Sequence, residues 1–310
     1  MKKRLGIIVL TLLNVILAHA QYDVQLSQHM FNRLSYNPAV TGASQYLNIN
    51  GNIRNQWHGW DGAPKAKTFS VHNFFNEIRS GIGVTVTQNE VGLENSFNIK
   101  LQYAYHVLLS PNSYLSLGLG GGVLHRYFDH SRAYSENIID DRDILLGLKR
   151  KTFVDFDFGI EYNMRHFTVG LSVTHLTNPG KSNDIYEIKR HYYGFARYQA
   201  VLTESWMLEP AVFFQNVNHF LHSELSLVTY YKKLFWFGMA YRIDTKMYGE
   251  ALVPVAGVKF GKYLHLGYSY DIYFGDLKKH TEGTHEVFIG IRIPKHTRKK
   301  GMYRSPRFVE

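Results

Sequence analysis

Few residues of this chain have the types and spacing that catalysis or metal binding requires. The 16 histidines include no His-Glu-x-x-His motif, and no serine lies in the Gly-x-Ser-x-Gly turn that exposes a nucleophile. The chain has no cysteine, which excludes thiolate chemistry and disulfide bonds. The sequence therefore predicts no catalytic residue, no metal site and no cofactor.

One acidic stretch has the residue type that calcium prefers, namely Asp140, Asp141 and Asp143. It lacks the glycine and the final glutamate of an EF-hand loop. A solvated loop is the favoured interpretation.

Charges inside otherwise neutral segments are more informative. Arg54 lies in such a segment, and so do Asp155, Asp157 and Glu161. Pairing of Arg54 with these three acids would make either a functional site or a purely structural network. The structural alternative is favoured, because unpaired charges are costly in a confined space away from bulk water.

The segments that carry these charges alternate with a period of two residues. From Phe167 to Thr174 every odd position is apolar and every even position is small or polar. Val154 to Tyr162 and Tyr263 to Ile272 repeat this alternation. The pattern predicts β-strands with one apolar face and one polar face.

A membrane barrel explains the pattern better than a water-soluble β-sandwich, which also alternates. Strands of about ten residues, tilted by about 40°, cover an apolar band of roughly 25 Å. Aromatic residues make up 15% of the chain, with 22 Tyr and 20 Phe, and these rings favour strands and membrane interfaces. The sequence therefore predicts an all-β fold, a transmembrane antiparallel β-barrel of about fourteen strands over residues 45–294.

Long and short connections alternate between the predicted strands. The long ones are residues 59–65, 90–94, 128–150, 178–189, 216–220, 244–249 and 275–283. The others are tight turns, such as Ser110-Pro111-Asn112. Outer-membrane barrels place long loops outside and short turns in the periplasm, so the alternation sets an orientation.

The two ends lie outside the predicted barrel. Residues 1–20 join a basic start to an apolar run too short for a transmembrane helix, which predicts a signal peptide and export to the outer membrane. Residues 21–44 are too irregular for a strand and predict a short N-terminal periplasmic or plug-like segment. Residues 295–310 form a basic tail, expected in the periplasm, that is either solvated or in contact with a partner.

The N-terminal segment from Gln25 to Gly42, with Asn37-Pro38-Ala39 near its end, closely resembles the signature of the PorP/SprF family. Arg54 to Trp57 and Gly59 to Pro64 resemble a second block of that family, and the resemblance extends over almost all of the predicted mature chain. The family consists of outer-membrane components of the type IX secretion system of Bacteroidetes.

The resemblance implies a non-enzymatic barrel that supports secretion or surface attachment of a large adhesin-like protein, in some cases for gliding motility. The expected partners are outer-membrane lipid, the secreted protein and other type IX secretion components in the periplasm. The net charge of +10 does not imply a nucleic-acid partner for an exported membrane protein. The Asn37-Pro38-Ala39 element also resembles the plug of FadL-like transporters of hydrophobic molecules, which is the alternative function.

A barrel of about fourteen strands is wider than its own side chains can fill, so a plug is expected. The candidate plug residues are Phe31, Asn32, Asn37, Pro38 and Gly42. They either bind a partner or only seal the lumen, and the two roles are compatible. Pro38 stiffens the turn by fixing its own φ and restricting Asn37, while Gly42 permits unusual backbone angles.

Overall fold

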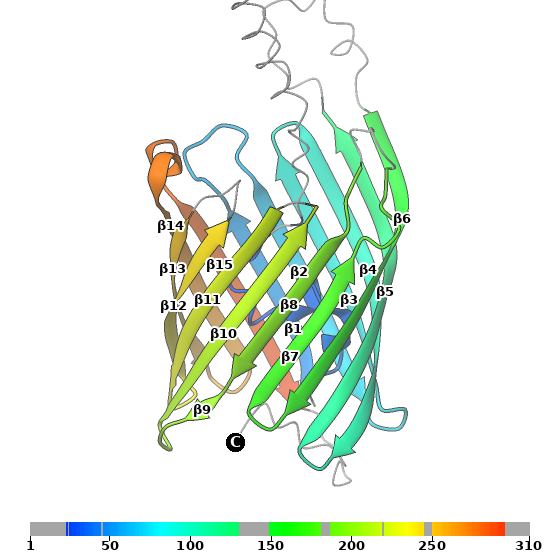
Figure 1. The fold of residues 1–310 in the computed structure, drawn as a ribbon, viewed down its shortest axis with the longest axis vertical. Coiled ribbons are helices and arrows are strands. Elements are labelled where there is room, and N and C mark those ends of the chain that lie inside the picture. Colours follow the sequence, from blue (N-terminus) through cyan, green and yellow to red (C-terminus); the bar gives the residue numbers. More distant parts are fainter. Residues whose placement is uncertain are drawn as a thin grey trace, which may run out of the picture.

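The computed structural model describes residues 23, 25–44, 46–129, 149–180, 187–218, 220–244 and 250–294. Within them the chain forms one antiparallel sheet that closes on itself as a barrel (Figure 1). Its strands are β1 (Tyr46–Asn55), β2 (Lys65–Phe75), β3 (Ser80–Val91), β4 (Glu94–Ser110), β5 (Ser113–Phe128), β6 (Lys149–Met164), β7 (Phe167–Thr174), β8 (His191–Tyr198), β9 (Ala200–Val201), β10 (Trp206–Val217), β11 (Phe220–Tyr231), β12 (Phe235–Asp244), β13 (Ala251–Phe260), β14 (Leu264–Tyr273) and β15 (Thr284–Pro294).

The barrel closes where β1 pairs with β15. The remaining strands pair with their neighbours in chain order, and β10 pairs with β11. The short β9 continues the line of β8 after Gln199, and both pair with β10. The wall therefore has fourteen strands, which confirms the predicted fold class.

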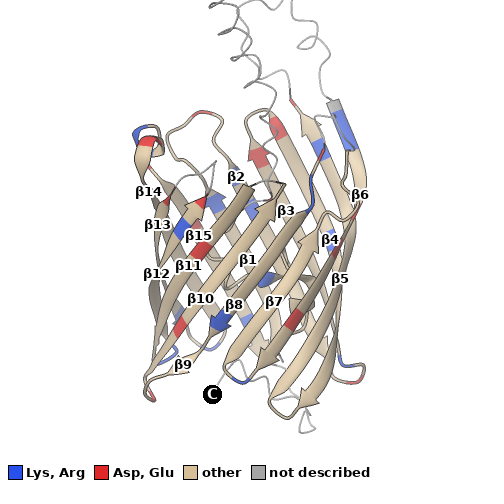
Figure 2. Cartoon of the chain, viewed as in Figure 1, with Lys and Arg blue, Asp and Glu red and all other residues tan. Residues whose placement is uncertain are grey.

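The alternation of residue types sorts side chains between the two faces of the wall. Phe156, Leu171 and Leu225 are 50%, 60% and 61% exposed, as expected for a lipid-facing surface, whereas Asp155 and Asp157, on either side of Phe156, are buried inside. Charged positions are few along the wall strands, as Figure 2 shows.

The connections alternate in length as predicted except at residues 90–94 and 216–220, where only two residues separate β3 from β4 and β10 from β11. At one end of the barrel the turns are short, with Pro111 and Asn112 alone between β4 and β5. At the other end, residues 56–64, 175–190 and 274–283 make longer connections. The tight turn after β11 places Lys232 and Lys233 at positive φ, as the two central residues of a type I′ turn require.

The N-terminal segment lies inside the barrel, where it forms the 3₁₀ helices η1 (Arg33–Ser35) and η2 (Pro38–Val40) (Figure 1). It begins at the long-connection end, where the backbone N–H of Asp23 donates to His191. It ends near the short turns, where the Tyr114 hydroxyl donates to the carbonyl of Ala43. We call residues 23–44 the plug, and they pass through the lumen from one end to the other.

Three sequence predictions fall outside the described residues: the signal peptide at 1–20, the acidic loop with Asp140, Asp141 and Asp143, and the basic tail at 295–310. In the part of the chain that is described, no helix is long and apolar enough to cross a membrane.

Candidate functional site: a plugged lumen and its mouth

The part of the plug nearest the short turns packs against glycines of the barrel wall. The Asn37 side-chain oxygen caps η2 by accepting from Ala39 N at 3.0 Å. A Cβ on Gly159 would lie 2.0 Å from that oxygen, and one on Gly118 would lie 2.1 Å from Ala39 N. The turn that begins at Pro38 can therefore approach the wall closely only because β5 and β6 have glycines there.

Gly42 makes the second close approach. Its φ of +71° lies in the left-handed region that glycine tolerates, and its N–H donates to His72 Nδ1 at 2.9 Å. A Cβ on Gly81 of β3 would lie 2.0 Å from the carbonyl oxygen of Thr41. The plug thus leaves the lumen against a second glycine position.

Phe31 and Asn32 anchor the middle of the plug. The Phe31 ring lies 5.3 Å from that of Phe288 in a stacked arrangement. The Asn32 amide donates to Asn52 at 2.9 Å, and the Ser70 hydroxyl donates to the Asn32 oxygen at 2.8 Å. All five predicted plug residues therefore lie in the lumen, and whether they also bind a partner remains a proposal.

Arg54 is completely buried beneath the part of the plug nearest the long connections. It donates to Asp271 at 2.7 Å and to Glu286 at 3.3 Å. Arg242 donates to the same Asp271 oxygen at 2.7 Å. Glu286 also accepts from the backbone N–H groups of Ser27 at 2.6 Å and Gln28 at 2.9 Å, which fixes the plug to β15.

The suggested pairing of Arg54 with Asp155, Asp157 and Glu161 is wrong. Arg54 lies directly opposite Glu286, because β1 pairs with β15, whereas β6 is several strands away around the wall. The sequence shows which side chains face inward, but it does not show which ones meet across a closed barrel.

The three acids of β6 pair with other cations. Lys100 donates to Asp157 at 2.8 Å and lies 3.2 Å from Asp155. Glu161 pairs with Arg33 of the plug. The acids therefore form a second buried network, which also holds the plug to the wall.

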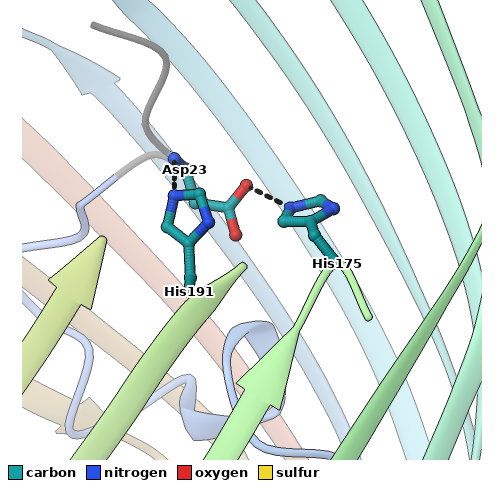
Figure 3. Close-up of side chains that lie close together, drawn as sticks. All are labelled: Asp23, His175 and His191. Atoms are coloured by element: carbon teal, nitrogen blue, oxygen red, sulfur yellow. Dashed lines mark hydrogen bonds and ion pairs between the residues drawn. The ribbon is translucent and has the colours of Figure 1, made fainter. Parts of the chain in front are cut away.

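A cluster at the long-connection mouth holds the first described residue of the plug (Figure 3). His175 lies between two carboxylates, with Nε2 2.9 Å from Asp23 Oδ1 and Nδ1 2.5 Å from Asp155 Oδ2. Burial opposes the charge of His175, but Asp23 and Asp155 outweigh it and raise the pKa of His175 to about 9. His191 completes the cluster by accepting from Asp23 N at 2.9 Å.

Sequence reasoning missed this cluster, as it missed the roles of Asp271 and Glu286. His175 and His191 are too widely spaced for any local metal motif, and Asp23 is separated from His175 by 152 positions. One indication of these roles was present in the sequence: the period-two pattern places Asp271 on the polar face of its strand.

A cavity of about 290 Å³ opens between the upper plug and strands β2 to β5. Besides Asp23 and His175, most of its wall residues are polar: Thr68, Thr85, Thr87, Asn89, Glu94, Ser96, Asn98, Lys100, Gln102 and Arg126. Apolar side chains line it as well, among them Leu26, Trp57, Leu124, Ile188 and Phe213, so the cavity offers hydrogen-bonding groups and apolar contacts together.

Fold and site together define a membrane β-barrel whose lumen holds a fixed N-terminal plug. The family model of the type IX secretion system membrane protein PorP/SprF matches residues 18–291. The chain belongs to this family, as its N-terminal motif indicated.

Among solved structures, the toluene transporter TbuX of Ralstonia pickettii is similar, with a TM-score of 0.52 and 10% identity over 90% of this chain and 96% of that one. Omp33 of Acinetobacter baumannii has a TM-score of 0.48 and 9% identity, and the match covers 82% of this chain and all of Omp33. At such identities the similarity to TbuX shows a shared fold and nothing more. No curated protein sequence matches the chain.

Proposed function

We propose that this protein is a non-enzymatic outer-membrane barrel that supports secretion or surface attachment of a large adhesin-like protein. Its membership of a type IX secretion family supports this role, and that family is not known for enzymes. The predicted signal peptide would export the chain. The long connections would then face outward and the short turns the periplasm, where other secretion components would bind.

One observation carries the proposal: a cavity with many hydrogen-bonding side chains at the long-connection mouth, above a plug tied to the wall by buried ion pairs. A fixed plug leaves the mouth as the place for a partner. An extended peptide segment would find hydrogen-bonding side chains there, including Thr87, Asn98 and Gln102.

The FadL-like alternative would need a passage for hydrophobic molecules. The lumen residues beside the plug are instead ionic, with Arg54, Arg242 and Lys100 each paired with carboxylates. Burying such groups along a hydrophobic route would be costly. The secretion role is therefore favoured.

The proposal is tested by filling the cavity with a larger side chain. Proteins lost from the cell surface when the gene is deleted define the cargo. Thr87→Trp should place an indole in the cavity and reduce surface cargo severalfold at an unchanged barrel level. Ile99→Trp is the matched control, because Ile99 is 44% exposed on the outer face, where tryptophan is tolerated.

Surface cargo is measured by mass spectrometry of peptides released from intact cells. Normal cargo with Thr87→Trp would remove the cavity from the mechanism. If gene deletion left surface proteins unchanged but stopped uptake of a hydrophobic compound, the transporter function would replace the proposal.

A further inference from the structure

The mouth cluster has the arrangement of a metal site. Asp23, His175 and His191 each offer one ligand atom, and these atoms lie within 4.8 Å of one another. In Figure 3 both imidazole rings lie beside the Asp23 side chain, one on each of two neighbouring wall segments. A tetrahedral zinc ion with bonds of about 2.0–2.1 Å holds its ligand atoms about 3.3 Å apart. To close the site, the ligand atoms must approach one another by up to about 1.5 Å, and His191 Nε2 must exchange its hydrogen bond from the Asp23 backbone N–H for the ion.

Each histidine has a second partner that sets its tautomer. His175 Nδ1 lies 2.5 Å from Asp155 Oδ2, and His191 Nδ1 lies 2.9 Å from the carbonyl oxygen of Lys189. Both acceptors favour a proton on Nδ1, so Nε2 of each ring is the atom that faces Asp23: that of His175 faces the carboxylate, and that of His191 accepts from the backbone N–H. Metal-binding histidines are commonly oriented by such partners.

The charge of the cluster also suits a cation. Asp23, Asp155 and Asp157 bring three carboxylates, and the ammonium of Lys100 neutralises one of them. With neutral histidines, two negative charges remain in a largely buried place. The imidazolium form of His175 offsets one of these charges, and a divalent ion would offset both.

We propose that Asp23, His175 and His191 bind a divalent transition-metal ion of the zinc class at the mouth of the barrel. Asp23 and His175 line the mouth cavity, which gives an entry path and room for a water molecule as fourth ligand. The ion joins the start of the plug to the segments beside β7 and β8. Its role is a clamp that keeps the plug in the lumen.

Zinc binding tests the proposal on the full barrel, purified through a tag without histidine and treated with EDTA. Calorimetry should show one Zn²⁺ bound per chain. Asp23→Asn and His191→Gln should each weaken binding at least tenfold. Asp23 lies outside the wall strands, so its variant should leave the barrel folded.

The matched control is His222→Gln. His222 is also a buried lumen histidine, and it lies 3.6 Å from Asp244, but it is outside the cluster. Its variant should bind Zn²⁺ as the unchanged protein does. Co²⁺ gives a second readout, because visible absorption bands of a four-coordinate site should appear in the unchanged protein and disappear with Asp23→Asn.

Absence of stoichiometric Zn²⁺ binding by the unchanged protein would overturn the proposal. Binding that survives both Asp23→Asn and His191→Gln would also overturn it, because the ion would then belong to other histidines. In either case the cluster is an imidazolium held between carboxylates without a metal.

Discussion

A single methyl group on the lumen wall should loosen the plug. Gly118→Ala places a Cβ 2.1 Å from Ala39 N, whereas ordinary contacts lie at 3.4–4 Å. The plug backbone must therefore move by about 1 Å or more, and overpacking of this kind costs about 1–3 kcal/mol. Since about 1.4 kcal/mol changes an equilibrium tenfold, the open plug should become about 5 to 150 times more populated.

A cysteine at Val40 reports the opening, because the chain has no native cysteine and Val40 is only 5% exposed. In the Val40→Cys background, Gly118→Ala should raise the rate of maleimide labelling by the same factor. Heat-modifiable mobility on gels should stay unchanged, because the strands keep their hydrogen bonds.

Gly51→Ala is the matched control. Gly51 is also a strand glycine, but a Cβ there would approach the Thr68 carbonyl oxygen only to 4.0 Å. Its labelling rate should equal that of the Val40→Cys parent. An unchanged rate with Gly118→Ala and a folded barrel would refute the argument that these glycines hold the plug in place.

Three further predictions follow from the networks and the topology. Asp271→Asn removes the carboxylate that Arg54 and Arg242 share. The free energy of unfolding should therefore fall by about 3–5 kcal/mol in a denaturant titration. Asp276→Asn, at a 91% exposed side chain, should cost less than about 1 kcal/mol. A cysteine at Asp276 should be labelled from outside intact cells and one at Asn112 should not; the reverse result would invert the orientation. In metal-free protein, the tie between His175 and Asp23 is complete below pH 6.5 and is lost as pH rises through about 9, because the folded pKa of His175 is raised. Protease cleavage of the plug should therefore accelerate through pH 9, and a similar acceleration with His175→Gln would contradict this cause.

The barrel was predictable because its causes are local. Alternation of residue types with period two depends only on the pleat of a strand, and the turns depend on a few neighbouring residues. Phe167 to Thr174 and Val154 to Tyr162 could therefore be assigned as strands from their own residues. The connection lengths indicated which strand ends lie at the same end of the barrel.

The plug was predictable only in part. The irregularity of residues 21–44 and the stiffness of Asn37-Pro38 indicated a plug, and the width of the barrel required one. The direction in which it runs was not predictable. Asp23 lies at the long-connection mouth because of contacts with His175 and His191, and the sequence separation between them hides those contacts.

The sequence alone thus determined the faces of the wall, an approximate number of strands and the family. The tertiary structure alone decided the partners of the buried charges. Arg54 faces the lumen by alternation, but closure of β1 on β15 gives it Glu286 in place of the acids of β6. Alternation is a property of one strand, whereas an ion pair across a lumen depends on the register and closure of the whole sheet.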